Sequence, residues 1–170
     1  MLACGAGSGD TSSSVTGGEG KSIESPAPEK TTTVAKVGQA VTLSYDGLGD
    51  KDTVEITLAN GKQHTKEPGS WGSKPERGVY LAFDVTVVCK EGTHYASPAN
   101  FKFVAKDGTV RDTAYASGFK RALDSIDLSQ GQKVAGKIVF DVSKADLNGG
   151  RIQIEGIGWD FDKPAAYWAL

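Results

Sequence analysis

The most regular apolar pattern in the chain runs from Arg77 to Lys90. Side chains alternate at period two in this segment, which is the pattern of a β-strand whose two faces lie in different surroundings. Burial of one large apolar side chain contributes roughly 1.5–3 kcal/mol, and no other segment has as many in register. We therefore predict a long strand inside a sheet, with one face on the core. The residues predicted to face the core are Leu81, Phe83, Val85, Val87 and Cys89.

Shorter alternating segments on both sides of this strand predict further strands. They are separated by turn signals rich in Gly, Asn, Asp and Pro. In the last of them, Trp168 shares a face with Ala166 and Leu170, so we expect its indole in the core. The predicted strands cover residues 34–37, 41–45, 53–59, 100–105, 133–142, 151–156 and 165–170.

Local signals predict two hairpins and a short helix. Asn60-Gly61 predicts a hairpin because both residues of a type I′ turn need positive φ, and residues 63–66 would form the returning strand. Asp107-Gly108 predicts a second hairpin for the same reason. Apolar spacing of three and four predicts one or two helical turns over Phe119, Ala122, Leu123 and Ile126.

The whole pattern predicts an all-β fold, an antiparallel β-sandwich preceded by a disordered tail. A chain of 170 residues suits one domain with a single core. Residues 1–33 are rich in Gly, Ser, Thr, Pro, Glu and Lys, so this segment buries too little surface to offset its ordering entropy. We predict a flexible linker at 1–33, with a reach of roughly 30 Å, and the sandwich domain at 34–170.

The N-terminal end resembles a lipidation signal. Leu2-Ala3-Cys4 followed by Gly is similar to the end of a bacterial lipobox, where a signal peptidase cuts before the cysteine. The resemblance implies a lipid thioether on Cys4, membrane attachment through that lipid, and no disulfide between Cys4 and Cys89. Met1 lies close upstream, so we expect that the signal peptide was trimmed or that the true start lies earlier.

Several sequence blocks, in order, resemble one family. They are KPERG at 74–78 with YLAFDVTV at 80–87, SPANFKF at 97–103, GQKVAGKIVFDV at 131–142 and PAAYW at 164–168. On these blocks, residues 34–170 are similar to a bacterial family of lipoprotein domains of unknown function, with actinobacterial members. That family is grouped with the secreted mycobacterial immunogenic antigen. The resemblance implies an immunoglobulin-like sandwich outside the cytoplasm, and it transfers no catalytic residue.

Charge and hydropathy exclude two classes of partner contact. The 19 basic and 21 acidic residues nearly cancel and form no basic run, whereas nucleic-acid binding needs clustered Lys and Arg. We therefore expect no nucleic-acid partner. The sequence contains no stretch of roughly 20 apolar residues that could span a bilayer, so membrane association would depend on the lipid anchor.

The sequence contains only weak signals of a metal site. Asp46, Asp50 and Asp52 lie close together in a loop and could supply oxygens to calcium, but the spacing and closing Glu of an EF-hand are missing. Turn-forming aspartates are the alternative interpretation. His64 and His94 are far apart, each without a second ligand at a metal-binding spacing. We expect no bound metal and no other cofactor.

No constellation typical of catalysis is found in the sequence. The Gly-x-Ser-x-Gly and phosphate-loop motifs are missing. Cys89 faces the predicted core, which does not suit a nucleophile. Asp160 and Asp162 could pair as carboxylates, but nothing around them indicates a raised pKa or a sugar cleft. We expect that the protein is not an enzyme.

Aromatic residues in loops are the best candidates for binding. Trp71, Trp159 and Phe161 lie in predicted loops, where aromatic side chains offer a large contact area at low entropic cost. The alternative is that they fold back and plug the ends of the sandwich. The sequence thus favours a lipid-anchored, extracytoplasmic binding module of a bacterial cell envelope, with a protein or cell-wall partner. The second hypothesis is a carrier of a small ligand or of calcium.

Overall fold

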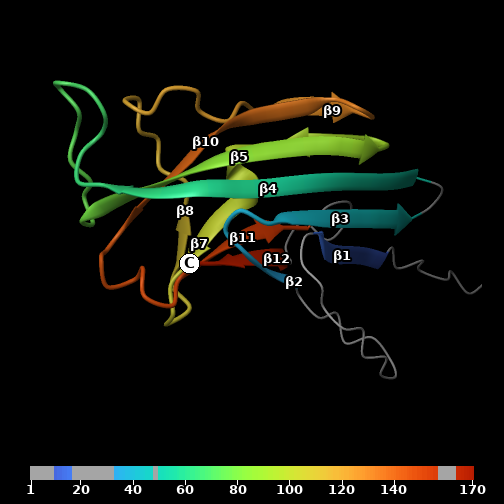
Figure 1. The fold of residues 1–170 in the computed structure, drawn as a ribbon, viewed down its shortest axis with the longest axis horizontal. Helices are drawn as coiled ribbons and strands as arrows, with labels where there is room; N and C mark the ends of the chain where they lie inside the picture. The colour runs from blue at the N-terminus through green and yellow to red at the C-terminus, as the bar shows by residue number, and fades with distance from the viewer. Residues whose placement is uncertain (1–9, 17–32, 48–49, 157–163) are drawn as a thin grey trace, which may run out of the picture.

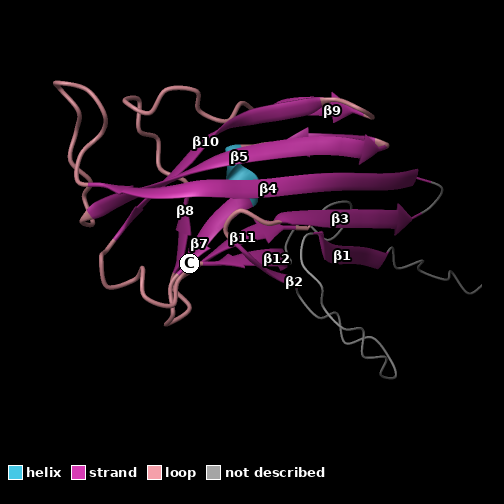
Figure 2. Cartoon of the chain, in the orientation of Figure 1, coloured by secondary structure: helices cyan, strands magenta, loops and turns pink. Residues whose placement is uncertain are grey.

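The structure is a computed structural model that describes residues 10–16, 33–47, 50–156 and 164–170. Strands dominate this part of the chain, and its helical element is a single 3₁₀ turn, η1 (Pro98–Asn100) (Figure 2). The strands are β1 (Asp10–Thr16), β2 (Thr33–Lys36), β3 (Ala40–Gly47), β4 (Asp50–His64), β5 (Val79–Glu91), β6 (Thr93–Ala96), β7 (Phe101–Val104), β8 (Val110–Asp112), β9 (Ile126–Ser129), β10 (Lys133–Val142), β11 (Arg151–Glu155) and β12 (Pro164–Ala169).

The strands form two large sheets and one small sheet. The first sheet has the order β1-β3-β4-β5-β10, the second has the order β2-β12-β11-β7-β8, and β6 pairs with β9 (Figure 1). All neighbours are antiparallel except β2 and β12, which run parallel. One apolar core contains residues from both large sheets. The predicted all-β, antiparallel sandwich is therefore confirmed.

Strand β5 has the position that its apolar pattern predicts. It lies inside the first sheet between β4 and β10, and its predicted core residues are at most 5% exposed. Cys89 is a free thiol with no exposed surface, and burial raises its pKa above the ordinary value. On the other face, Tyr80 and Ala82 are also buried, so the start of β5 is covered on both sides.

Trp168 lies in the core, as predicted. Its side chain has no exposed surface, and its Nε1 donates to the carbonyl oxygen of Gln39 at 3.0 Å. The indole therefore keeps its polar group satisfied while its ring is buried. Leu170, expected on the same face, is 44% exposed because β12 ends one residue earlier.

The hairpin predicted at Asn60-Gly61 is wrong. Strand β4 continues through both residues, and the register slips from Ala59 paired with Asp84 to Lys62 paired with Ala82. Two residues of β4 therefore oppose Phe83 alone, which is a β-bulge. Asn60 has φ 54°, so the positive φ that favours a tight turn is used here inside a strand. The Asp107-Gly108 hairpin is confirmed between β7 and β8.

The helical turns predicted from Phe119 to Ile126 are also wrong. Phe119 and Leu123 are buried, but Ala122 and Ile126 are exposed, and the backbone at Arg121 and Leu123 pairs with β10 instead of forming helical hydrogen bonds. The Lys137 amide donates to the Arg121 carbonyl at 2.7 Å, and the Leu123 amide donates to the Lys137 carbonyl at 2.9 Å. Arg121 has φ 61°, which a right-handed helix does not allow. The backbone groups of Arg121 and Leu123 thus bond to the edge of β10, where a helix would have bonded them within their own segment.

Residues 10–16 correct the linker prediction for part of the tail. They form β1, which pairs antiparallel with β3 along seven residue pairs from Asp10 opposite Asp46 to Thr16 opposite Ala40. Backbone pairing to an open sheet edge needs no apolar side chains, so composition did not reveal this strand. The remaining residues of the linker segment before Thr33 lie outside the described residues.

We predict that Gly136→Ala destabilises the sandwich by about 1–3 kcal/mol. A Cβ at Gly136 would lie 2.4 Å from the Cα of Leu123 and 2.6 Å from its amide nitrogen, so the segment that covers the β10 edge would have to move. Denaturant unfolding measures the free energy of unfolding. The exposed neighbour Ala135 provides the control, because Ala135→Ser is expected to change stability by less than about 0.5 kcal/mol. Equal stability of the Gly136 variant and the wild type would contradict the prediction.

Candidate functional site

Two loops with exposed aromatic side chains lie at one end of the sandwich. The tryptophan loop (residues 65–78) connects β4 to β5, and the tyrosine loop (residues 113–125) connects β8 to β9; both lie at the left of Figure 1. Trp71 is 98% exposed and Tyr115 is 96% exposed. Such large apolar side chains, left uncovered on loops of a rigid scaffold, are candidates for contact with a partner.

The base of the tryptophan loop is closed by its own backbone and by Glu67. The Glu67 amide donates to the carbonyl oxygen of Ser73 at 2.8 Å, and the Gly72 amide donates to the carbonyl oxygen of Gly69 at 3.4 Å. Trp71 therefore lies near the tip of a tight turn. Glu67 itself is only 7% exposed, which is rare for a carboxylate unless it is paired or hydrogen-bonded.

The Glu67 side chain joins the two loops. Its Oε2 accepts a hydrogen bond from the Gly118 amide at 3.1 Å. A Cβ at Gly118 would lie 2.7 Å from the Glu67 Cβ and 2.8 Å from the Pro68 carbonyl oxygen. Only glycine allows this close approach without displacement of the backbone. The loops are thus held against each other by one buried carboxylate and one glycine.

Asp141 on β10 holds the other end of the tryptophan loop. Its two carboxylate oxygens accept from the backbone amides of Glu76 at 2.7 Å and of Arg77 at 3.0 Å. The Tyr80 hydroxyl donates to the Lys74 carbonyl oxygen at 3.3 Å. Burial raises the pKa of the Tyr80 phenol above its ordinary value of 10.0, and nearby carboxylates add to the rise, so this donor stays protonated at neutral pH.

Aromatic packing holds the tyrosine loop against the first sheet. The Phe119 ring meets the Tyr80 ring edge-on with centroids 5.7 Å apart, and it meets the His64 ring edge-on at 5.0 Å. Phe119 and Tyr80 form a second small cluster with Ala82 and Val139 on the outer face of the first sheet. The tyrosine loop therefore rests on the sheet rather than projecting freely.

A polar groove with a volume of about 680 Å³ lies between the two loops. This volume falls in the range of small-ligand sites, roughly 300–1,000 Å³. Tyr115 and Val110 supply apolar surface to it, and most of the remaining lining is charged. Its charged side chains are Glu67, Lys74, Glu76, Arg77, Arg111, Asp112 and Asp141.

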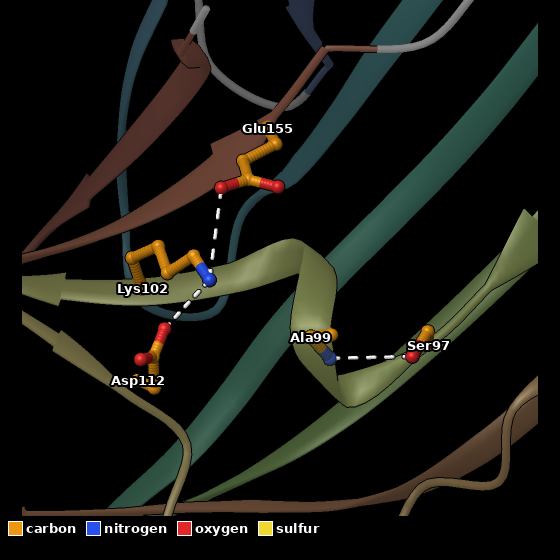
Figure 3. A network of polar contacts seen from close by, with 5 residues as sticks. All are labelled: Ser97, Ala99, Lys102, Asp112 and Glu155. Atoms are coloured by element: carbon orange, nitrogen blue, oxygen red, sulfur yellow. Dashed lines mark hydrogen bonds and ion pairs between the residues drawn. The ribbon is translucent and has the colours of Figure 1, made fainter. Parts of the chain in front are cut away.

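Most carboxylates of the groove already have partners. Glu67 and Asp141 accept from backbone amides, as described above. Asp112 receives the Lys102 ammonium at 2.6 Å, and Lys102 also lies 3.7 Å from Glu155 (Figure 3). The hydrogen bond to Asp112 is the main reason that the pKa of Lys102 is raised. This network links β7, β8 and β11 beside the groove.

The cationic side chains of the groove have fewer hydrogen-bond and ion-pair partners than its carboxylates. Within the described part of the chain, the side chains of Lys74, Arg77 and Arg111 make no hydrogen bond or ion pair. The Nε of Arg111 is buried and has no partner there. Lys74 and Arg77 are exposed, so their charged ends are open to a ligand.

Of the three sequence-based aromatic candidates, the structure describes the position of Trp71. Trp71 is exposed and does not plug the end of the sandwich. Trp159, Phe161 and the carboxylates Asp160 and Asp162 lie outside the described residues, as does Cys4. Tyr115 was missed by sequence reasoning. Its sequence signal is an aromatic residue within the run Thr113–Gly118, which is otherwise made of small residues.

The candidate calcium loop does not bring its described aspartates together. Asp46 pairs with Lys51 and Asp52 pairs with Tyr45 across β3 and β4, so Asp46 and Asp52 point to opposite faces of the sheet. Asp52 also accepts from the Thr93 amide at 2.8 Å. The Asp50 side chain lies outside the described residues. Across the described ranges, no three His, Cys, Asp or Glu side chains gather in a metal-binding group.

The fold and the site define an all-β sandwich domain with two exposed loop aromatics, Trp71 and Tyr115, and a polar groove that Tyr115 lines. Within this class, the chain belongs to the domain of unknown function DUF4352, whose family model matches residues 49–163. The resemblance to a family of domains of unknown function is thereby confirmed. No curated protein matches the chain. None of the helices in the described residues is long and apolar enough to cross a membrane.

Solved structures of low sequence identity share the fold. The secreted protein MPT63 from Mycobacterium tuberculosis is 17% identical with a TM-score of 0.62, and the match covers 84% of this chain and 100% of that protein. The yjhA protein from Bacillus subtilis is 17% identical with a TM-score of 0.55, over 71% and 81% of the two chains. A candidate lipoprotein from Bacillus subtilis, ycdA, is 12% identical with a TM-score of 0.54, over 69% of this chain and 36% of that one.

We predict that Asp141→Ala loosens the tryptophan loop and lowers stability by about 1–3 kcal/mol. The variant removes the acceptor of the Glu76 and Arg77 amides. Hydrogen exchange at these two amides should therefore accelerate, with smaller changes elsewhere. Asp124→Ala, at an exposed aspartate of the tyrosine loop, is the control. Unchanged exchange at both amides in the Asp141 variant would show that the carboxylate does not hold the loop.

Proposed function

We propose that this protein is a non-catalytic binding module of a bacterial cell envelope, with an immunoglobulin-like sandwich attached by a lipid outside the cytoplasm. The observation that carries the proposal is the exposure of Trp71 and Tyr115, at 98% and 96%, on two loops that the sandwich holds in place. Exposed aromatic residues on a preorganised scaffold bind at low entropic cost. The partner is protein or cell-wall material of the envelope.

The similar proteins support the location. MPT63 is described as secreted, and ycdA is described as a candidate lipoprotein. In this chain, Leu2-Ala3-Cys4 resembles the end of a lipobox, and the sulfur of Cys4 would form the lipid thioether. Diacylation gives stable anchoring, whereas one acyl chain gives marginal binding. A lipid at Cys4 then holds the sandwich on the membrane surface.

Strand β1 changes the geometry of that attachment. The chain from Cys4 to the first paired residue, Asp10, can span at most roughly 20 Å. Had the whole linker been free, its reach would be roughly 30 Å. Pairing of β1 with β3 therefore keeps the sandwich closer to the membrane than composition alone suggests.

The roles of three of the four groove carboxylates support a function without catalysis. Glu67 and Asp141 hold the two loops through backbone amides, and Asp112 is paired with Lys102. A general acid or base needs a proton to exchange with the substrate at a suitable pKa. These carboxylates instead serve as fixed acceptors that shape a binding surface.

Trp71→Ala should weaken binding to the envelope. We expect that the chain with Cys4→Ser, which removes the lipid, co-sediments with isolated actinobacterial cell envelopes. In that background Trp71→Ala should reduce the affinity about tenfold or more, the usual loss at an aromatic hot spot. The matched control is Tyr95→Ala, at an aromatic residue of β6 that is 54% exposed. Equal loss for both variants, or no binding by the parent chain, would refute the proposed function.

Mass analysis of the protein matured in an actinobacterial host tests the anchor. We expect a mature N-terminus at Cys4 with the mass of an added diacylglyceryl group and partition into detergent, because two acyl chains anchor stably. Cys4→Ser should abolish both. A mature form that retains Leu2 and Ala3 without added lipid would exclude the anchor and leave the binding loops untested by this measurement.

A further inference from the structure

We infer that the groove between the tryptophan and tyrosine loops binds a glycan chain, with one sugar ring stacked on Tyr115 and its hydroxyl groups inside the groove. This inference names the partner class for the binding module and rests on that proposed function. It draws on the charge balance of the groove, its unsatisfied donors and the position of its exposed aromatic ring.

The charge balance favours a ligand without strong net charge. The lining has three cationic side chains, Lys74, Arg77 and Arg111, and four carboxylates. One carboxylate, Asp112, is neutralised by Lys102 at 2.6 Å. Three charges of each sign remain. A polyanion or a polycation would therefore meet as much repulsion as attraction.

A hydroxyl-rich ligand can satisfy both kinds of group. Each hydroxyl both donates and accepts, so neighbouring hydroxyls can accept from Arg77, Arg111 and Lys74 and donate to Glu76. Arg111 lines the groove, and its side chain makes no hydrogen bond or ion pair within the described residues. Arginine presents several donors in one plane, which suits adjacent hydroxyls of a ring. A groove of about 680 Å³ has space for a small polar ligand or a segment of a chain.

The position of Tyr115 completes a site for a sugar. Its side chain lines the groove and yet is 96% exposed, so its ring face is open to a ligand. Sugar rings have an apolar face of C–H groups that packs against an aromatic ring, while their hydroxyls point outward. Val110, also in the lining and 54% exposed, extends this apolar side. One side of the groove is thus apolar and the rest is polar.

A protein partner in this groove is disfavoured by the same observations. The centres of protein interfaces are depleted of charged residues and rich in apolar anchors, whereas here most lining residues are charged. An acidic peptide would satisfy the arginines but would place its carboxylates beside Glu76, Asp141 and Glu67. Like charges at such sites oppose binding.

Titration with neutral oligosaccharides tests the inference on the full chain with Cys4→Ser. The probes are hexamers of β-linked N-acetylglucosamine and of β-linked glucose, with hexaglutamate as the acidic peptide. We expect at least one oligosaccharide to bind and to shift amide resonances of both loops. Affinity should change less than about threefold between low and high salt, because binding does not depend on net charge. Hexaglutamate should not bind.

Matched variants locate the site. Tyr115→Ala and Arg111→Gln should each weaken oligosaccharide binding by about tenfold, and Arg77→Gln should act in the same direction. The controls are Tyr95→Ala on β6 and Arg121→Gln, since Arg121 is exposed and is not part of the groove lining. Both controls should bind like the wild type. Thermal unfolding verifies that all variants remain folded.

Three outcomes would overturn the inference. They are failure of both oligosaccharides to bind, equal effects of the groove and control variants, and stronger binding of hexaglutamate than of either oligosaccharide. In each case the proposed function is judged separately by co-sedimentation with envelopes. Loss of envelope binding in Trp71→Ala, together with no oligosaccharide binding, would keep the binding module and replace the glycan by a protein partner.

Discussion

The candidate site depends on backbone hydrogen bonds along the free edge of β10. Ala114 donates to Val139 at 2.7 Å, and Arg121 and Leu123 exchange hydrogen bonds with Lys137 at 2.7 and 2.9 Å. An uncovered edge would leave these polar groups of the strand open to pairing with other chains. Because the tyrosine loop bonds to this edge, its backbone is held in place along β10. The position of Tyr115 and the groove beside it follow from that pairing.

The tryptophan loop is fixed by a different interaction, a pair of carboxylates that accept from backbone amides. Glu67 joins it to the tyrosine loop, and Asp141 joins it to β10. Charge-assisted hydrogen bonds of this kind are stronger than neutral ones, and they keep the loops preorganised. These two acids of the groove therefore have a structural role, which agrees with the binding function proposed above. Preorganised loops lose little entropy when a partner binds.

How far the sequence predicted the fold differs from element to element. Strand β5 could be predicted because its apolar side chains repeat at the period of a strand, and the structure buries all five predicted core residues. Asn60-Gly61 was misread because positive φ is common to a hairpin turn and to a bulge. In the structure the bulge lies opposite Phe83 in the neighbouring strand, and a Cβ at Gly61 would lie 2.7 Å from the Phe83 ring. That contact links residues far apart in the chain.

The sequence by itself determined the all-β sandwich, the burial of Cys89 and Trp168, and the position of Trp71 in a loop. These properties depend on side-chain period and on local turn chemistry, which act within a few residues. Only the tertiary structure decided that residues 10–16 pair with β3, that the segment after Phe119 pairs with β10, and that Tyr115 borders a groove. Each of these depends on a sheet edge or a loop supplied by a distant part of the chain. No local pattern can encode such a neighbour, because the free energy of the contact exists only once both segments are in place.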